Sequence, residues 1–403
     1  MEADQKNQIE LPQEVLLAEL MSTLKEYLVA SELEQVEQAY QLASEAHQGQ
    51  YRLSGEDYIC HPVSVALILA RMKLDVDCIM AAIMHDVLED TDTTFDELAQ
   101  LFNDDVAGLV DAVSKLTKIN FKTREEAQAE NMRKMFLAMA KDLRVIIIKL
   151  ADRLHNMRTI NVMKPASRRR IAKETLDIYA PIAHRLGMHE FRLELEDLSF
   201  EAMFPRRKSI ITKSIKKARG NRKEVVDKAV KLLIDRFLET KFPGLISGRE
   251  KNLYSIYRKM KRQAIPFNEV FDVYAFRVIV ETTEQCYQAL GLLHNLFKPV
   301  PGKFKDYIAL PKSNGYQSLH TVLVGPFGVP IELQIRTVGM DRVAESGIAA
   351  HWLYKTTDVA HDAQVRAHEW LRNLLETQKN SDDSFEFIDT LKVDLFPTEI
   401  FVF

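Results

Sequence analysis

Apolar residues recur every three or four positions along the first half of the chain, where turn-forming residues are few. The stretches LILARMKLDVDCIMAAIMHDVLED and LRVIIIKLADRLHNMRTI show this pattern most clearly. The spacing is typical of helices that bury one face. Three prolines fall where new helices are expected to begin, since a missing N–H costs little in a first turn: Pro62, Pro165 and Pro181. The pattern predicts an all-α domain over residues 1–200.

The pattern changes to alternation after residue 242. VFDVYAFRVIV has the two-residue period of a strand, and HTVLVGPFGVPIELQIRT is typical of two strands joined around Gly325–Gly328. Helical spacing returns over Met340–Lys379. We therefore expect an α/β domain over residues 243–380, with a mixed sheet flanked by helices. The closing LKVDLFPTEIFVF starts a new β unit, so residues 381–403 are expected to be a linker and the truncated start of a further domain.

Residues 201–242 are expected to form a basic helical linker between the two domains. Between Arg206 and Lys223 the chain has nine basic residues and no acidic one, namely Arg206, Arg207, Lys208, Lys213, Lys216, Lys217, Arg219, Arg222 and Lys223. Two interpretations stay open. Such a run is often a solvated helix face, and it also suits an RNA or phosphate surface.

The composition of this 403-residue chain restricts the kinds of ligand and the cellular compartment that can be expected. Its 54 Lys and Arg face 58 Asp and Glu, so no overall positive field attracts nucleic acid and any anionic ligand must be held locally. Cys60, Cys78 and Cys286 lack the spacing of a disulfide framework or a thiolate zinc site. The polar start and the lack of a long apolar run argue against secretion and membrane insertion. We expect a cytoplasmic protein with no membrane partner.

Two histidines and two aspartates of the helical half form a first candidate site: His61, the adjacent pair His85 and Asp86, and Asp152. Imidazoles combined with carboxylates suit a divalent metal such as Mn²⁺, Fe²⁺ or Zn²⁺. A metal lowers the pKa of its bound water toward neutrality, which would make the site hydrolytic. Each residue alone also has a structural interpretation, such as His61 capping a turn before Pro62.

Further polar residues share helix faces with these ligands. Glu89 and Asp90 follow Asp86 by three and four positions, which places the three carboxylates along one side of a helix. We expect Glu89 and Asp90 to take a proton from water or to orient it, although a solvated helix edge is the alternative. A second polar stripe has spacings of four and three: Asp152, Asn156 and Thr159.

A second candidate site lies in the α/β half. The segment GREKNLYSIYRKM holds donors that phosphates prefer, although a surface helix with scattered basic residues is the alternative. These donors are Arg249, Lys251, Ser255 and Lys259. Asp272 interrupts an apolar strand, where an unpaired carboxylate would be costly to bury. Alternation in PIELQIRT places Glu332, Gln334 and Arg336 on one face of a strand, opposite an apolar face.

The segment GKFKDYIALPKSNGYQSLHT lies between the two carboxylates. Its cationic or hydrogen-bonding residues include Lys305, Lys312, Asn314 and His320. Tyr316 follows a predicted turn and can stack on a base. Two acids for Mg²⁺, surrounded by basic residues for a triphosphate, favour phosphoryl or pyrophosphoryl transfer. The P-loop pattern GxxxxGK[ST] is absent from the sequence, so the expected enzyme is of another class.

Eight collinear motifs resemble those of the RelA/SpoT homologues, long bifunctional enzymes that make and destroy the alarmone (p)ppGpp. They are YRLSGEDYICHP, MHDVLEDT, KLADRLHNMRT, GREKNLYSIYRKM, FDVYAFRVI, YIALPKSNGYQSLHT, IELQIRT and ESGIAAHW. The resemblance implies a multidomain chain, with an all-α HD-type hydrolase domain followed by an α/β nucleotidyltransferase-like synthetase domain. It also implies that residues 381–403 open a TGS domain.

The resemblance assigns the first site to release of the 3′-pyrophosphate of (p)ppGpp. His61, His85, Asp86 and Asp152 would bind Mn²⁺, while Glu89 and Asp90 would activate water. Arg52 would contact the guanine. The nucleotide pocket would be shaped by Lys115, Asn156 and Thr159.

The resemblance assigns the second site to pyrophosphate transfer from ATP to the 3′-hydroxyl of GDP or GTP. Asp272 and Glu332 would hold Mg²⁺, and Glu332 would bind the metal or deprotonate that hydroxyl, after which AMP leaves. Tyr316 would stack on the acceptor guanine. Phosphates would be held by Arg249, Lys251, Lys259, Lys305, Lys312 and His320, with Ser255, Asn314 and Gln334 as further binding residues.

The KFKD sequence at Lys303–Asp306 is the basic variant of bifunctional members, and we expect hydrolysis to dominate over synthesis. The alternative is a hydrolase whose second domain only binds a regulatory nucleotide. Expected ligands are ppGpp, pppGpp, GDP, GTP and ATP, in stringent-response control. Ribosome, RNA or carrier-protein regulators would act through a missing C-terminal half.

Overall fold

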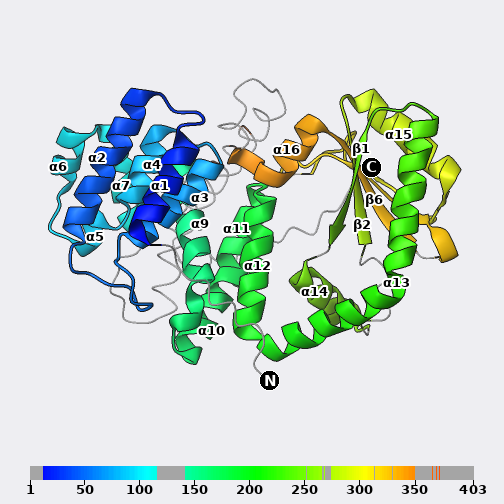
Figure 1. The fold of residues 1–403 in the computed structure, drawn as a ribbon, viewed down its shortest axis with the longest axis horizontal. Coiled ribbons are helices and arrows are strands. Elements are labelled where there is room, and N and C mark those ends of the chain that lie inside the picture. Colours follow the sequence, from blue (N-terminus) through cyan, green and yellow to red (C-terminus); the bar gives the residue numbers. More distant parts are fainter. Residues whose placement is uncertain are drawn as a thin grey trace. The chain divides into compact units, whose positions relative to one another are not determined.

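The computed structural model describes residues 12–115, 141–250, 252–265, 267, 274–312, 314–328 and 330–349, together with 365, 369 and 372. The chain divides into two compact units (Figure 1). Unit 1 comprises Met1–Pro165 and His368–Phe403, and unit 2 comprises Ala166–Ala367. Each unit is described by itself below.

The described residues of unit 1 form helices joined by turns, with an isolated β-bridge between Tyr51 and Asp57, which confirms the all-α expectation for this part of the chain. Its helices are α1 (Gln13–Leu24), α2 (Ala30–Ala46), α3 (Cys60–Arg71), α4 (Val76–Ile83), α5 (Val87–Asp90), α6 (Phe95–Leu101), α7 (Asp104–Lys115) and α9 (Leu143–Arg158), followed by the short η1 (Ile160–Val162). Nearly every residue of α3 is buried, because α3 packs against α1, α4 and α9. The central position of α3 explains its almost continuous apolar sequence.

Side-chain caps fix the starts of α4, which leads to the site residues His85 and Asp86, and of α9, which carries Asp152. The Asp75 carboxylate accepts a hydrogen bond from Cys78 N at 2.9 Å at the start of α4. Asp142 accepts one from Arg144 N at 2.8 Å at the start of α9. Such caps satisfy backbone donors that have no partner within the helix.

Unit 2 begins with helices whose apolar spacing continues that of the first half. They are α10 (Pro165–Glu174), the π-helical turn η2 (Thr175–Tyr179), α11 (Ala180–Arg185), α12 (His189–Met203) and the long α13 (Pro205–Glu239). α12 packs against α11, α13, α14 and α16 within unit 2. The predicted domain boundaries at residues 200, 242 and 380 stay predictions.

A mixed sheet forms the centre of unit 2, as expected from the alternating sequence. Its strands are β1 (Leu245–Glu250), β2 (Tyr274–Val280), β3 (Lys298–Pro299), β4 (Lys305–Asp306), β5 (Leu319–Val324) and β6 (Pro330–Thr337). The order is β1-β2-β6-β5-β3, with β4 paired to β5. Only β2 and β6 run parallel among the described pairs. The predicted hairpin is β5 and β6, joined by the short η4 (Pro326–Gly328).

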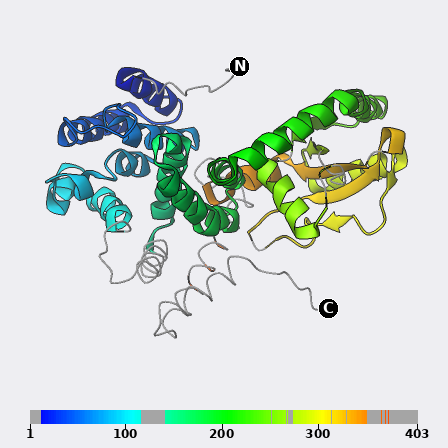
Figure 2. The same cartoon turned by 90° about the horizontal axis from the view of Figure 1, so that it is seen from below.

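The two faces of this sheet differ in polarity. Phe276 and Leu333 belong to an apolar cluster with Leu233 and Phe237 of α13 (green in Figure 2) and with Leu293 of α15 (Thr283–Leu296). The helices α14 (Leu253–Gln263) and α16 (Val338–Ser346) and the turn η5 (Gly347–Ala349) complete the described unit. The opposite face carries the polar residues of β5 and β6 and is therefore available for a site.

Candidate functional sites

Three segments of unit 1 bring the predicted metal ligands together. His61 lies in α3, His85 and Asp86 lie between α4 and α5, and Asp152 lies in α9. One ligand atom from each of His61, His85 and Asp86 lies within 4.8 Å of the others. Nε2 of His85 is 3.1 Å from Asp86 Oδ2, and Nε2 of His61 is 3.3 Å from Asp152 Oδ1. This spacing is suited to one divalent cation.

The hydrogen bonds of the two histidines show whether these residues fit a metal. Nδ1 of His85 lies 2.7 Å from the carbonyl oxygen of Ala82 and must donate to it, so Nε2 is the atom that carries the lone pair once the ring is neutral. That buried Nε2 makes no well-aligned hydrogen bond and has the Asp86 carboxylate 3.1 Å away. Nδ1 of His61 pairs with Nδ1 of His155 at 2.7 Å, and Nε2 of His61 also faces the carboxylates. Both Nε2 atoms are therefore placed as ligands, and the residues fit the metal.

The pKa values of the four predicted metal ligands show which of them must lose a proton before a metal can bind. Only one of the four, His85, must do so at neutral pH. Burial lowers the pKa of His61. Burial acts in the same direction on His85, but the charges of Asp86 and Asp152 outweigh it and raise the pKa of His85 to about 9. Burial alone would raise the pKa values of Asp86 and Asp152. His85 holds that of Asp86 low, and Lys149 and the histidines hold that of Asp152 low.

Tyr58 joins the ligand Asp86 to the predicted catalytic carboxylates. Its hydroxyl lies 2.8 Å from Asp86 Oδ2 and 3.1 Å from Asp90 Oδ2. Burial, followed by the charge of Asp86, raises the pKa of Tyr58, so its proton stays on the hydroxyl at neutral pH. Asp90 is exposed and Glu89 is partly exposed, both on α5. Our sequence reasoning missed Tyr58, although its place three residues before His61 was a usable signal.

Arg52 connects the predicted nucleotide-binding residues of unit 1. Its Nη2 donates to Asn156 Oδ1 at 3.0 Å and lies 3.3 Å from Thr159 Oγ1. Arg52 also lies 3.6 Å from Glu56. The polar residues of α9 that follow Asp152, namely Asn156 and Thr159, therefore contact the guanidinium group of Arg52. Lys115 is the last residue of α7, and its side chain lies outside the described part of the structure.

The polar face of the sheet in unit 2 brings together seven of the residues predicted for the second site. They are Lys305, Lys312, Asn314, Tyr316, His320, Glu332 and Gln334. His320 is opposite both Lys305 and Gln334 in the sheet. Its Nε2 is 2.7 Å from the Tyr316 hydroxyl, and its Nδ1 is 3.9 Å from Glu332 Oε1. Burial lowers the pKa of His320 to about 4 against the opposing charge of Glu332, so the ring is neutral.

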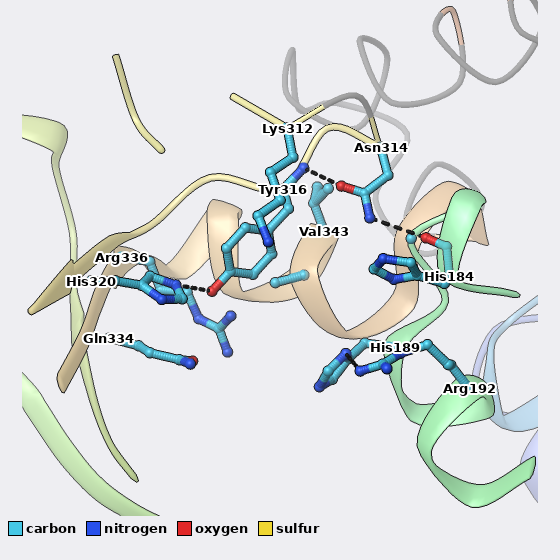
Figure 3. Close-up of a pocket in the computed structure, with 12 residues that line it drawn as sticks. His184, His189, Arg192, Lys312, Asn314, Tyr316, His320, Gln334, Arg336 and Val343 are labelled. Carbon is cyan, nitrogen blue, oxygen red and sulfur yellow. Dashed lines mark hydrogen bonds between the residues drawn. The ribbon is translucent and has the colours of Figure 1, made fainter. Parts of the chain in front are cut away.

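Five of these seven residues, all except Lys305 and Glu332, line a cavity of about 160 Å³ (Figure 3). The Lys312 ammonium lies 5.2 Å from the centre of the Tyr316 ring, in cation–π contact. Tyr316 N donates to Asn314 Oδ1 at 3.2 Å, which fixes the turn that presents the tyrosine. An aromatic ring, amides and cations around one cavity can bind a nucleotide.

The remaining predicted residues lie elsewhere or outside the described residues. Ser255 and Lys259 are on α14, which packs through Ile256 in an apolar cluster, and neither lines the cavity. Arg249 is in β1 opposite Ala275, and its side chain is not described. Lys251 and Asp272 lie outside the described residues. Of the two carboxylates expected to hold Mg²⁺, the structure therefore describes only Glu332.

Four polar side chains that we did not predict as parts of a site also line the cavity. His184, His189 and Arg192 come from α11 and α12, and Arg336 comes from β6. Arg336 shares the polar face of β6 with Gln334, so its alternation was a signal. His184, His189 and Arg192 are more than a hundred residues before Lys312 and the lining residues that follow it in the sequence, in a segment whose pattern is that of an ordinary amphipathic helix.

Two models of known families match the chain. An HD domain model matches residues 39–189, and a model of the region found in RelA and SpoT proteins matches residues 248–359. No helix within the described ranges is long and apolar enough to cross a membrane.

The chain is also similar to curated proteins over most of its length. It is 54% identical to the bifunctional (p)ppGpp synthase/hydrolase SpoT of Escherichia coli, over 96% of this chain and 55% of that protein. It is 47% identical to a GTP pyrophosphokinase of Myxococcus xanthus, over 94% and 51%. The chain spans about half the length of the curated relatives it matches. A solved structure of small alarmone synthetase 1 from Bacillus subtilis bound to pppGpp covers 42% of this chain and 96% of that chain, with 27% identity and a TM-score of 0.30.

Proposed function

The chain belongs to the RelA/SpoT family, and we propose from that premise that it hydrolyses (p)ppGpp at unit 1 and makes it at unit 2. Hydrolysis would release pyrophosphate and return GDP or GTP. Synthesis would transfer pyrophosphate from ATP to the 3′-hydroxyl of GDP or GTP. The observation that carries the hydrolytic part is the His61–His85–Asp86 group, whose ligand atoms lie within 4.8 Å of one another.

Hydrolases with an HD domain are metal-dependent, and we propose Mn²⁺ for this site. His61, His85 and Asp86 would hold the ion, with Asp152 oriented beside His61. When bound, the metal would offset phosphate charge and lower the pKa of water. Glu89 and Asp90 would accept the proton of the attacking water.

The neighbouring side chains position these groups. The Tyr58 hydroxyl bridges Asp86 and Asp90, which holds a proton-accepting carboxylate at a fixed place relative to a ligand carboxylate. Arg52, held by Asn156 and Thr159, would contact the nucleotide.

The proposed synthetic reaction rests on the polar face of the sheet. Glu332 lies beside His320, which is neutral at pH 7 and can accept or donate a hydrogen bond. Glu332 would bind Mg²⁺ together with Asp272, or take the proton of the acceptor 3′-hydroxyl. Tyr316 would stack on the guanine, and Lys305 and Lys312 would hold phosphates. The second candidate is a regulatory nucleotide-binding unit, which the same cavity would serve.

A substrate panel tests the hydrolytic assignment. The chain is incubated with ppGpp, pppGpp, deoxynucleoside triphosphates and cyclic nucleotides, with Mn²⁺ or with chelator. We expect GDP or GTP plus pyrophosphate from the first two compounds and only with metal. Turnover of the deoxynucleotides alone would instead indicate a general HD nucleotide hydrolase.

A separate assay tests synthesis. ATP and GDP with Mg²⁺ should yield AMP and ppGpp, and Glu332→Gln should abolish both products while Glu281→Gln, at an exposed position, should not. If GDP binds but no AMP forms, unit 2 is the regulatory binding unit. We further propose a cytoplasmic location, the nucleotide ligands ppGpp, pppGpp, GDP, GTP and ATP, and ribosome, RNA or carrier-protein regulators as further partners.

A further inference from the structure

The cavity of unit 2 has a second wall that comes from the turn between α11 and α12. His184, His189 and Arg192 form this wall, which we call the α11–α12 wall. Figure 3 shows it across the open space from Tyr316 and Arg336. No role has been given to these three residues so far.

Backbone contacts fix the α11–α12 wall to the rest of unit 2. Asn314 Nδ2 donates to the carbonyl oxygen of His184 at 3.0 Å, and Ile348 N donates to that of Leu186 at 3.0 Å. A Cβ on Gly347 would lie 2.3 Å from Leu186 O and 2.4 Å from the carbonyl carbon of Gly187. No side chain fits there, and Gly347 also has a positive φ of 59°. The wall is therefore a built part of the cavity.

The charged residues that line the cavity all have one sign. None of the described residues that line it is acidic, while Arg192, Lys312 and Arg336 carry permanent positive charge. Arg336 is 1% exposed and pairs with Asp341, and Arg192 pairs with Glu196 at 3.1 Å. Neither acid is among the lining residues, so these pairs hold the guanidinium groups from behind.

Two further observations favour an anionic occupant. The Nε atoms of Arg192 and Arg336 are buried and have no hydrogen-bond partner among the described residues. Packing, and then the charges of Arg192 and Lys312, lower the pKa of His184 to about 4, although part of its side chain stays exposed. A positive potential that extends to the cavity mouth is what a phosphate group requires.

We propose that the α11–α12 wall, through Arg192 with His189 beside it, binds the 5′-phosphates of the guanine nucleotide acceptor. This assignment rests on the proposed function of unit 2. Glu332, Gln334 and Arg336 follow one another on the same face of β6, and four residues along a strand span about 13 Å. A nucleotide with its sugar at Glu332 can therefore extend its charged end toward Arg336 and Arg192.

Binding measurements on the full chain test the proposal with guanosine, GMP and GDP as probes. Glu196 is buried, so removing Arg192 alone would leave an unpaired buried carboxyl group. The informative variant is therefore Arg192→Gln combined with Glu196→Gln, compared with Glu196→Gln alone. We expect the double variant to bind GDP about tenfold to a hundredfold more weakly than the single variant, the range for a hydrogen bond to a charged group. Guanosine affinity should be the same in both.

A control and a second variant keep the test sharp. Arg170→Ala removes an exposed positive charge from α10 and should leave GDP binding unchanged. His189→Ala, which keeps the Arg192–Glu196 pair, should weaken GDP binding by a smaller factor and spare guanosine. In the synthetic reaction, the double variant should raise KM for GDP and leave KM for ATP unchanged.

The outcomes separate this inference from the proposed function. An equal loss for guanosine and GDP would mean that Arg192 recognises the base, which overturns the proposal, as would a wild-type chain that does not bind GDP. The wild-type chain could instead bind GDP, lose that binding in the Arg192 variant, and make no ppGpp. The proposed synthetic activity would then be wrong, and the phosphate-binding role of Arg192 would stand.

Discussion

Metal binding at the His61–His85–Asp86 group should release about one proton for each ion bound, because one of the ligands is protonated beforehand. His85 has a pKa of about 9 without metal, since the charges of Asp86 and Asp152 outweigh its burial. The pKa of His61 is lowered, so that ring is already neutral, and the carboxylates of Asp86 and Asp152 are already ionised. Only His85 must lose a proton at neutral pH.

The size of the effect follows from this pKa. At pH 7 a group with a pKa of 9 is neutral in about 1% of molecules, so the apparent metal affinity should be about 100-fold below its limit at high pH. Because the pKa of His85 is raised, the affinity rises with pH and levels off above pH 9. Between pH 6.5 and 8 the association constant should increase about tenfold for each pH unit.

Calorimetric titration of the full chain with Mn²⁺ measures both quantities. Two buffers with different ionisation enthalpies give the number of protons released, and a series from pH 6.5 to 8 gives the slope. His294→Gln, a change at a partly exposed histidine of unit 2, should leave both unchanged. An affinity independent of pH, with no proton released, would refute the assignment of His85 Nε2 as a ligand.

Three further outcomes follow from the same geometry. His155→Ala removes the partner of His61 Nδ1 at 2.7 Å and should weaken Mn²⁺ binding about 10- to 100-fold in the same titration, as loss of a group that orients a ligand does. Gly347→Ala would place a Cβ 2.3 Å from Leu186 O, so the α11–α12 turn must shift; GDP binding should fall while Mn²⁺ binding is retained. Without metal, protonated His85 stabilises the folded chain fully below pH 6.5, because its pKa is raised in the folded state, and this contribution is lost as the pH rises to 9. The melting temperature measured with chelator should therefore fall between pH 6.5 and 9. A constant melting temperature over that range would mean that the pKa of His85 is not raised.

Much of the fold was predictable from the sequence because its patterns are local. The period of apolar residues in α3, α4 and α9 reports burial on a helix, and the alternation of β5 and β6 reports a two-sided sheet. Glu332, Gln334 and Arg336 fall on one face as expected, because strand geometry alone decides that question. The strand order and the parallel pairing of β2 with β6 depend on long-range packing and were not predictable.

The residues of the two sites also divide into those that local sequence motifs predict and those that only the three-dimensional structure brings together. The sequence motifs pointed to His61, His85 and Asp86, and the structure places them together. The hydrogen bond from Tyr58 and the pairing of His155 with His61 required the three-dimensional arrangement. His184, His189 and Arg192 carried no signal, because a helical turn reveals nothing about a sheet more than a hundred residues away in the sequence. The roles of the predicted site residues remain predictions until they are measured.

The most direct test of the central claim is the rate of pyrophosphate release from ppGpp by the full chain with Mn²⁺, compared between wild type and Asp86→Ala. Asp86 belongs to the ligand group and contacts His85, His61 and Tyr58. Our account predicts turnover by the wild type, no detectable turnover by Asp86→Ala, and wild-type turnover by the exposed control Asp96→Ala, with all three chains folded. Release of pyrophosphate by Asp86→Ala at the wild-type rate would contradict it.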